Sequence, residues 1–257
     1  MKAVILAGGF GSRLSEQTTQ IPKPMVEIGG KPILIHIMES YSRYGINDFV
    51  ICAGYKANYI KQYFVNYNLN LYDVSVKTAT NEINFFNGNA PDWNITVIDT
   101  GLNTMTGGRL KRIKKYVENE PFFHMTYGDG VCDLDISELT KFHVTHEKSA
   151  TVTSVLPVGR FGALKTETSA CVTAFEEKPA GDGGRINGGY FVLSPSVLDT
   201  IQNDQTVWEQ EPLVELAAKR ELYAFNHDGF WHPMDTLRDK NYLEELWETG
   251  AAPWKVW

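Results

Sequence analysis

Short apolar runs without polar alternation recur through the first half of the chain. Such runs are typical of strands that are buried on both faces of a parallel sheet. Stretches with apolar residues at helical spacing separate the runs and predict amphipathic helices, the first of which Pro32 opens and Gly45 ends. We expect strands at 3–7, 49–52, 74–77, 95–98 and 122–126, and helices at 32–44, 59–64 and 107–117.

The second half has a different rhythm, with fewer helices between its strands. We expect these strands at 150–156, 170–175, 189–193 and 222–225. They favour a mixed extension of the same sheet, and the count of about four βα units excludes a TIM barrel, which needs eight. We therefore predict one Rossmann-like α/β domain over 1–257, with an open, mixed but mostly parallel sheet flanked by helices and a smaller β-rich extension. The polar residues 78–92 are predicted to form a long loop, which would be a lid or a contact arm.

Composition excludes several classes of protein. Hydrophobic residues make up 43% and charged residues 21% of the 257 residues, which excludes disordered, collagen-like and coiled-coil chains. The net charge of −7 speaks against a nucleic-acid partner. Cys52, Cys132 and Cys171 are too scattered for a zinc site or a disulfide framework. Because the apolar runs are also too short for a signal peptide or a membrane span, we expect a cytoplasmic protein without a membrane partner.

The strongest chemical signal is Leu6-Ala-Gly-Gly-Phe-Gly-Ser-Arg-Leu14, directly after the first predicted strand. Glycines in such a loop allow backbone N–H groups to approach a phosphate closely, and Arg13 adds a guanidinium that suits phosphate oxygens. A dinucleotide fingerprint fails because Leu14 occupies the third glycine position, which disfavours a hydride-transferring oxidoreductase. A Walker A loop is also absent from the sequence.

Two further segments carry charge at defined places. Pro22 and Pro24 hold the backbone stiffly around Lys23. By itself this is also the pattern of a surface turn with a solvated lysine, but the glycine loop shortly upstream favours a functional cation. Asp129 follows a predicted strand, where open α/β sheets place their ligands, and it suits Mg2+ with Asp235 as the second carboxylate. Two other acidic residues are expected to have no role in the site: Asp135 is predicted to cap a helix, and Asp239 is predicted to be a solvated residue on a helix face.

The glycine loop and the Pro22–Met25 segment together resemble the sugar-1-phosphate nucleotidyltransferases, the nucleotide-sugar pyrophosphorylases. The resemblance continues through Tyr127-Gly-Asp-Gly130, Phe175-Glu-Glu-Lys-Pro179 and Asn187-Gly-Gly-Tyr190, so it covers nearly the whole chain. It implies the fold of the nucleotide-diphospho-sugar transferases, with a nucleotide-binding half at 1–135 and a sugar-phosphate-binding half at 136–257. It also implies a metal held between Asp129 and Asp235.

The same resemblance implies the site residues. Those implied for catalysis are Arg13, Lys23 and Asp129. Those implied for nucleotide binding are Leu6, Ala7, Gly8, Gly9, Phe10, Gly11, Ser12, Arg13, Lys23, Thr104, Arg109, Gly128 and Asp129. Those implied for the sugar phosphate are Gly162, Glu177, Lys178, Asn187 and Gly188, with Lys178 on the phosphate.

Four stretches resemble one branch of the family, whose members transfer a cytidylyl group from CTP to α-D-glucose 1-phosphate. These are Met105–Arg112, Gly159–Ala163, Trp208–Pro212 and Pro233–Asp239. The likeness implies CTP and glucose 1-phosphate as substrates, Mg2+ as cofactor, and a place in the synthesis of the dideoxyhexoses of bacterial lipopolysaccharide O-antigens. Two alternatives stay open: a thymidylyl- or uridylyltransferase acting on another sugar 1-phosphate, and a non-catalytic nucleotide-sugar sensor. The sensor could bind without the metal pair, so the joint presence of the charged residues above argues against it.

The C-terminal end, 246–257, is rich in tryptophan. Trp254 and Trp257 would be poorly covered on a lone chain, which predicts a homo-oligomer; the competing possibility is that the tail folds back onto its own subunit. We expect most of the tryptophans in the core or in an interface rather than stacked on sugar. The six histidines show neither a catalytic triad nor metal-ligand spacing.

Overall fold

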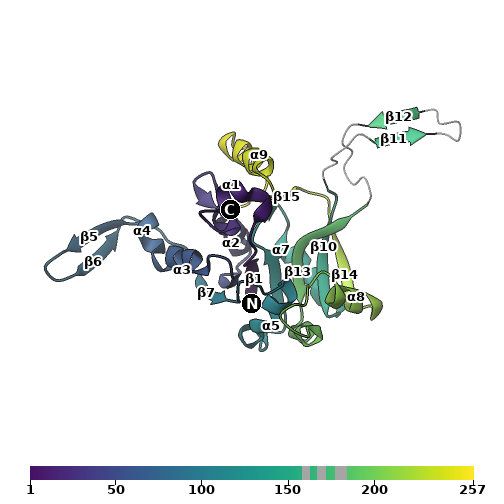
Figure 1. Cartoon of the computed structure of the whole chain (residues 1–257), viewed down its shortest axis with the longest axis horizontal. Helices are drawn as coiled ribbons and strands as arrows, with labels where there is room; N and C mark the ends of the chain where they lie inside the picture. Colours follow the sequence, from purple (N-terminus) through teal and green to yellow (C-terminus); the bar gives the residue numbers. More distant parts are fainter. Residues whose placement is uncertain (158–162, 167–171, 177–183) are drawn as a thin grey trace.

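A computed structural model describes residues 1–157, 163–166, 172–176 and 184–257. Its centre is a seven-stranded sheet in the order β14-β10-β13-β8-β1-β4-β7 (Figure 1). The strands are β1 Lys2–Ala7, β4 Asp48–Ala53, β7 Asn94–Asp99, β8 Phe123–Tyr127, β10 Ala150–Val155, β13 Ile186–Leu193 and β14 Leu222–His227. Only β13 runs antiparallel to its neighbours, β8 and β10. The predicted mixed, mostly parallel sheet is confirmed, and the strands of the second half do continue it.

Alternate side chains of the central strands pack into two cores, one on each face of the sheet. Ala3 and Ile5 of β1 face one core, and Val4 and Leu6 face the other. The first core is covered by α2 Ile33–Arg43, α3 Ala57–Val65, α7 Ile136–His146 and α9 Leu237–Glu248. The second is covered by α5 Thr106–Arg112, α6 Lys114–Val117, the 3-10 helix η3 Pro195–Thr200 and α8 Glu211–Ala218. Coverage on both faces explains why these strands are apolar without alternation.

The prediction of a loop at 78–92 is wrong. Residues Glu82–Phe86 form β6, which pairs antiparallel with β5, Asp73–Lys77. This hairpin is connected through α4 Tyr67–Leu71 and projects from the body as an arm, so β5 is not part of the central sheet (Figure 1). Every residue of both strands is exposed. Asn81 adopts φ 53° in the turn, a left-handed conformation that asparagine tolerates better than most residues.

The tryptophan-rich tail folds back onto its own chain. Trp254 is 1% exposed, and its indole Nε1 donates to His36 Nδ1 at 3.3 Å. Trp247 and Trp257 also pack their rings against His36, whose Nε2 donates to the Ile28 carbonyl at 2.8 Å. Burial lowers the pKa of His36 to about 4, so the ring is neutral. The coverage of the tail within its own chain therefore removes the argument for a homo-oligomer that was based on exposed tryptophans. The homo-oligomer stays a prediction.

Shorter elements complete the described chain. They are η1 Ser12–Leu14, α1 Ser15–Thr18, η2 Lys23–Met25, and the strand pairs β2 Glu27–Ile28 with β3 Lys31–Pro32, β9 Gly130–Cys132 with β15 Trp231–Pro233, and β11 Ala163–Thr166 with β12 Val172–Glu176. Residues 170–171 of the strand predicted at 170–175 lie outside the described residues. Among the described helices, none combines the length and the hydropathy that crossing a bilayer requires.

Candidate active site

Two adjoining cavities open where β1 and β8 end, at the carboxyl edge of the sheet. The glycine-loop cavity, of about 570 Å³, is bounded by the loop after β1 and the start of α5. The Asn187 cavity, of about 510 Å³, is bounded by the start of β13, Glu209 and the β9–β15 pair. Tyr127 and Asp129 line both cavities. A ligand that spans the two would pass over these residues, as expected for the crevice of an open α/β sheet.

The glycine loop is shaped by close contacts beneath it. A Cβ on Gly8 would lie 2.1 Å from Arg109 Nη1, whereas a Cβ on Gly9 would have nothing within 4 Å. Gly8 is therefore packed against a side chain, and Gly9 borders open space. Gly11 adopts φ +64°, which favours glycine where the chain turns into η1.

Arg109 supports this loop from below. A basic residue on an amphipathic helix is expected to face water, but Arg109 is only 5% exposed. Its Nη1 donates to the carbonyls of Ala53 and Gly101 at 3.2 and 2.8 Å, and its Nη2 donates to the Gly8 carbonyl at 3.0 Å. Burial lowers the pKa of this guanidinium. Arg109 lines the glycine-loop cavity, but the bonds above direct its guanidinium to backbone carbonyls.

The other residues predicted to bind nucleotide occupy different positions. Leu6, Gly8, Gly9, Phe10 and Thr104 line the glycine-loop cavity. Ala7 is buried in the core, and Ser12 begins η1. The Gly128 N–H donates to the Leu6 carbonyl at 2.9 Å, and a Cβ there would come within 3.1 Å of Pro24. Gly128 thus brings β8 close to the segment that carries Lys23.

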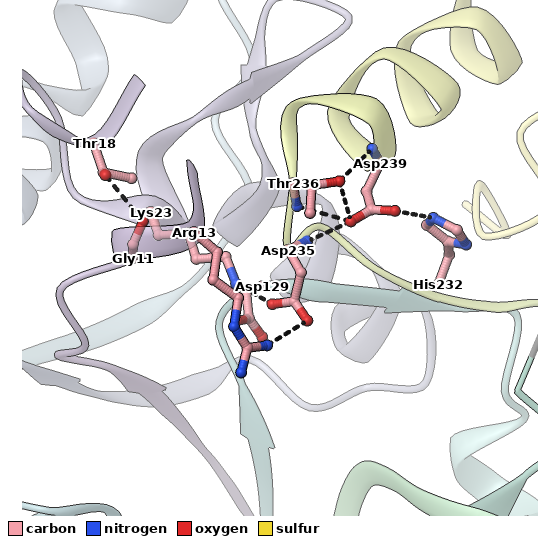
Figure 2. A network of polar contacts seen from close by, with 9 residues as sticks. All are labelled: Gly11, Arg13, Thr18, Lys23, Asp129, His232, Asp235, Thr236 and Asp239. Atoms are coloured by element: carbon pink, nitrogen blue, oxygen red, sulfur yellow. Dashed lines mark hydrogen bonds and ion pairs between the residues drawn. The ribbon is translucent and has the colours of Figure 1, made fainter. Parts of the chain in front are cut away.

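An ion-pair cluster joins four of the predicted charged residues. Lys23 Nζ lies 2.6 Å from Asp129 Oδ2 and 2.7 Å from Asp235 Oδ1. Burial acts to lower the pKa of Lys23, but the charge of Asp129 and the hydrogen bonds to both carboxylates outweigh it, so the pKa is raised. Arg13 Nη1 lies 3.3 Å from Asp235 Oδ2, with its side chain 77% exposed (Figure 2). The cluster is brought together from η1, η2, the end of β8 and the start of α9.

The β9–β15 pair explains how the two aspartates meet. Asp129 immediately precedes β9 and Asp235 follows β15, and Gly130 pairs with Pro233 across the ladder. The Met234 N–H donates to the Asp129 carbonyl at 2.7 Å. The two carboxylates share one cation, the Lys23 ammonium, and their hard oxygen atoms are of the kind that Mg2+ prefers. This donor set fits a divalent cation held between Asp129 and Asp235.

Asp239 fixes the segment behind Asp235. The prediction of a solvated residue is wrong: Asp239 Oδ2 accepts from the backbone N–H groups of Asp235 and Thr236 at 3.1 and 2.7 Å. Thr236 accepts in return from the Asp239 N–H, which completes a capping box at the start of α9 (Figure 2). His232 Nε2 lies 3.3 Å from the other Asp239 oxygen. The cap of α7 is as predicted, with Asp135 accepting from the Glu138 N–H at 2.9 Å.

The Asn187 cavity is walled by side chains. Asn187 Oδ1 accepts from the Gly189 N–H at 2.8 Å, and Gly188 lines the same cavity. Glu209, which the sequence reasoning did not single out, accepts from the hydroxyl groups of Tyr127 and Thr106. The available signal was the family-like stretch Trp208–Pro212, which contains it. Three predicted sugar-phosphate residues, Gly162, Glu177 and Lys178, lie outside the described residues.

One group of possible metal ligands lies away from these cavities. Cys132, Asp133 and His227 place one ligand atom each within 4.8 Å of one another. His227 Nε2 is 2.9 Å from Asp133 Oδ1, so the pair ties the end of β14 to the segment after β9. Sequence spacing could not reveal this group, because His227 is far from the other two along the chain.

Comparisons with known proteins agree with this architecture. The family model described as "Nucleotidyl transferase" matches residues 2–239. Glucose-1-phosphate cytidylyltransferase of Salmonella typhi is 60% identical over all of both chains, and the probable enzyme of that name from Bacillus subtilis is 43% identical, again over all of both chains. The crystal structure of HddC from Yersinia pseudotuberculosis, complexed with GMP-PN, superposes with a TM-score of 0.70 at 25% identity, covering 96% of this chain and 99% of that one. Family members generally use a divalent metal. The chain belongs to the nucleotidyl transferase family.

Proposed function

We propose that this protein transfers the cytidylyl group of CTP to α-D-glucose 1-phosphate and forms CDP-glucose and pyrophosphate. The observation that carries the proposal is the 60% identity, over the whole of both chains, to a glucose-1-phosphate cytidylyltransferase. Two adjoining cavities that share Asp129 and Tyr127 suit a reaction between two phosphate-bearing substrates. We place the nucleotide in the glycine-loop cavity and the sugar phosphate in the Asn187 cavity, and we place the enzyme in the cytoplasm.

In this reaction a phosphate oxygen of glucose 1-phosphate attacks the α-phosphorus of CTP. A new P–O bond forms as the bond to the bridging oxygen of the β-phosphate breaks, and pyrophosphate leaves with that electron pair. No protein nucleophile is required, so catalysis consists of positioning and neutralisation of charge. The backbone amides of Gly8 and Gly9, together with Arg13, would hold the β- and γ-phosphates.

Lys23 and the two aspartates act at the reacting phosphates. Mg2+ bound by Asp129 and Asp235 would supply charge neutralisation there. Lys23, which contacts both carboxylates, would then direct its ammonium towards the phosphate oxygens. Thr104 would contact the nucleotide, with Arg109 holding the loop that binds it, and Asn187 and Gly188 would contact the sugar. Gly162, Glu177 and Lys178 keep their predicted roles at the sugar phosphate.

The test is pyrophosphate release with CTP, UTP, dTTP and GTP, each crossed with the 1-phosphates of glucose, mannose, galactose and N-acetylglucosamine. We expect CTP with glucose 1-phosphate to give the highest kcat/KM, with CDP-glucose as the product. A higher value for dTTP or UTP, or for another sugar, would assign the chain to a different branch. Tight binding of nucleotide sugars with no pyrophosphate release in any combination would identify it as a sensor.

A further inference from the structure

Glu209 brings a third carboxylate to the Asn187 cavity. Within the described part of the cavity lining, the other carboxylates are those of Asp129 and Asp235. The backbone of Glu209 is well anchored, because its neighbour Trp208 is fully buried and the Trp208 N–H donates to Thr106 Oγ1 at 2.9 Å. The side chain itself is exposed to the cavity. A charged group on a rigid segment, facing a ligand cavity and outside the metal cluster, is a candidate for substrate recognition.

Both oxygen atoms of this carboxylate are held by hydroxyl groups. Oε1 accepts from the Tyr127 hydroxyl, and Oε2 accepts from Thr106 Oγ1 at 2.6 Å. The two donors come from fixed elements, Tyr127 from the end of β8 and Thr106 from the first turn of α5. A carboxylate offers about four acceptor positions, so capacity for further donors remains after these two bonds.

Tyr127 is itself held by its packing against β13. Asn187, at the start of this strand, lines the same cavity, and its Oδ1 accepts from the Gly189 N–H. The ring fits closely against the backbone of Gly189, where a Cβ would lie 2.6 Å from Cδ2. Hydrogen bonds therefore join Tyr127, Glu209 and Thr106 at the cavity wall, and Asn187 lines the same cavity.

Charge separates the two ends of the cavity. Arg13 lines one side and contacts Asp235, as does Lys23, so this side carries the cations that would neutralise the reacting phosphates. Glu209 has no basic partner among its described contacts, and its negative charge would repel a phosphate. A neutral sugar hydroxyl, in contrast, is a donor that a carboxylate binds well. The ring of a sugar phosphate therefore suits the Glu209 side, and its phosphate suits the Arg13 side.

Resting on the proposed function, we propose that Glu209 accepts a hydrogen bond from a ring hydroxyl of the hexose and contributes to sugar specificity. Tyr127 and Thr106 are positioning residues that hold its carboxylate. Glu209 would add a residue of the Trp208–Pro212 stretch to the sugar site, in the cavity that Asn187 and Gly188 line.

The test compares the wild type with Glu209→Gln on glucose 1-phosphate and on its 2-, 3-, 4- and 6-deoxy analogues. Glu211→Gln is the matched control, since it removes a nearby exposed carboxylate that does not line the cavity. We expect Glu209→Gln to lower kcat/KM for glucose 1-phosphate about 10- to 100-fold, the effect of losing a hydrogen bond to a charged group, and to leave the KM for CTP unchanged. For one deoxy analogue the wild type and the variant should then be equally active, because the hydroxyl that Glu209 binds is missing.

An equal loss on glucose 1-phosphate and on all four analogues would overturn the inference and make Glu209 a structural residue. So would a rise in the KM for CTP as large as that for the sugar. Tyr127→Phe keeps the ring and removes the O–H, so it should give a smaller loss with the same insensitive analogue. A wild type that is active only with another sugar 1-phosphate contradicts the proposed function, and the deoxy series of that sugar then decides the role of Glu209.

Discussion

The glycine-loop cavity and the Asn187 cavity lie side by side, yet they are built from different parts of the chain. The first includes the glycine loop, where the backbone at Gly8 rests on the buried guanidinium of Arg109. The second is lined by the side chains of Tyr127, Asn187 and Glu209, of which Tyr127 and Glu209 are hydrogen-bonded to each other. A side chain added at Gly8 would disturb this packing, whereas the exposed side chains of the second cavity can be altered one group at a time. The comparison therefore predicts which mutations affect the fold and which affect only a substrate.

Asp129 borders both cavities, so its replacement should have the largest effect. Asp129→Asn should lower kcat about a hundredfold to a thousandfold, the range for losing one preorganised electrostatic group. The fold should persist, because Lys23 keeps its contact with Asp235. The measurement is pyrophosphate release at saturating Mg2+ together with the unfolding midpoint. Asp135→Asn, which retains the cap of α7, is the control, and near-normal turnover of Asp129→Asn would contradict the role.

Lys23 contacts the two carboxylates that would hold a divalent cation. Lys23→Met should lower kcat about a hundredfold while weakening CTP binding much less, because the ammonium acts where charge develops. Without nucleotide, the variant should bind Mn2+ more tightly than the wild type, since the two aspartates lose their resident cation. Calorimetry with Mn2+ and with CTP checks both statements. Weakened CTP binding with full turnover would make Lys23 only an anchor.

The glycine loop offers a matched pair of substitutions. Gly8→Ala places a Cβ 2.1 Å from Arg109, and such overpacking should destabilise the fold by about 1–3 kcal/mol. Gly9→Ala meets no atom within 4 Å, so stability should be unchanged and only the KM for CTP should rise. Denaturant unfolding and steady-state kinetics on both variants test the pair. Equal stability of the two would show that the Gly8 contact with Arg109 does not support the loop.

Acid should destabilise the fold through His36, which lines neither cavity, so this change should have the smallest effect on the site. The pKa of His36 is lowered to about 4, so the native state binds fewer protons than the unfolded state between about pH 4 and 6.5. The contribution of neutral His36 to the free energy of unfolding is complete above pH 6.5 and is lost as the pH falls towards 4. From pH 7 to 5 the free energy of unfolding should fall by about 2 kcal/mol through this residue.

His36→Gln should flatten that part of the stability profile, as followed by urea unfolding at each pH. No histidine is among the described residues that line either cavity, so the variant and the wild type should have the same two KM values at each pH. An unchanged slope in the variant would exclude His36 as the source of the acid sensitivity.

Sequence patterns within short segments predicted those features that depend on neighbouring residues in the chain. The strands beside the glycine loop, and the positions of Lys23 and Asp129, follow from apolar runs, glycines and prolines within short segments, whereas the pairing of Asp235 with Asp129 came from the family resemblance. Arg109 could not be oriented in this way, because a basic residue near the end of a helix usually faces water, and its carbonyl partners are contributed by other segments. Asp239 was misplaced for a related reason, since its bond to the Asp235 N–H forms only when the chain turns into α9.

The arm and Glu209 show a second limit. The apolar residues at 82–86 lie among polar ones, and their pairing with β5 leaves both faces exposed, so burial gives no pattern to recognise. The carboxylate of Glu209 is positioned by hydrogen bonds from Tyr127 and Thr106, which are remote from it in sequence. Interactions between distant segments of this kind are not encoded in local spacing.

We assign one cavity to CTP and the other to glucose 1-phosphate. This assignment is tested most directly by measuring the KM values for both substrates in Gly9→Ala and in Asn187→Ala. The structure predicts a crossed pattern: Gly9→Ala raises the KM for CTP and leaves that for glucose 1-phosphate unchanged, and Asn187→Ala does the reverse. If both KM values rise together in both variants, or if Asn187→Ala weakens CTP instead, the assignment of one cavity to each substrate is wrong.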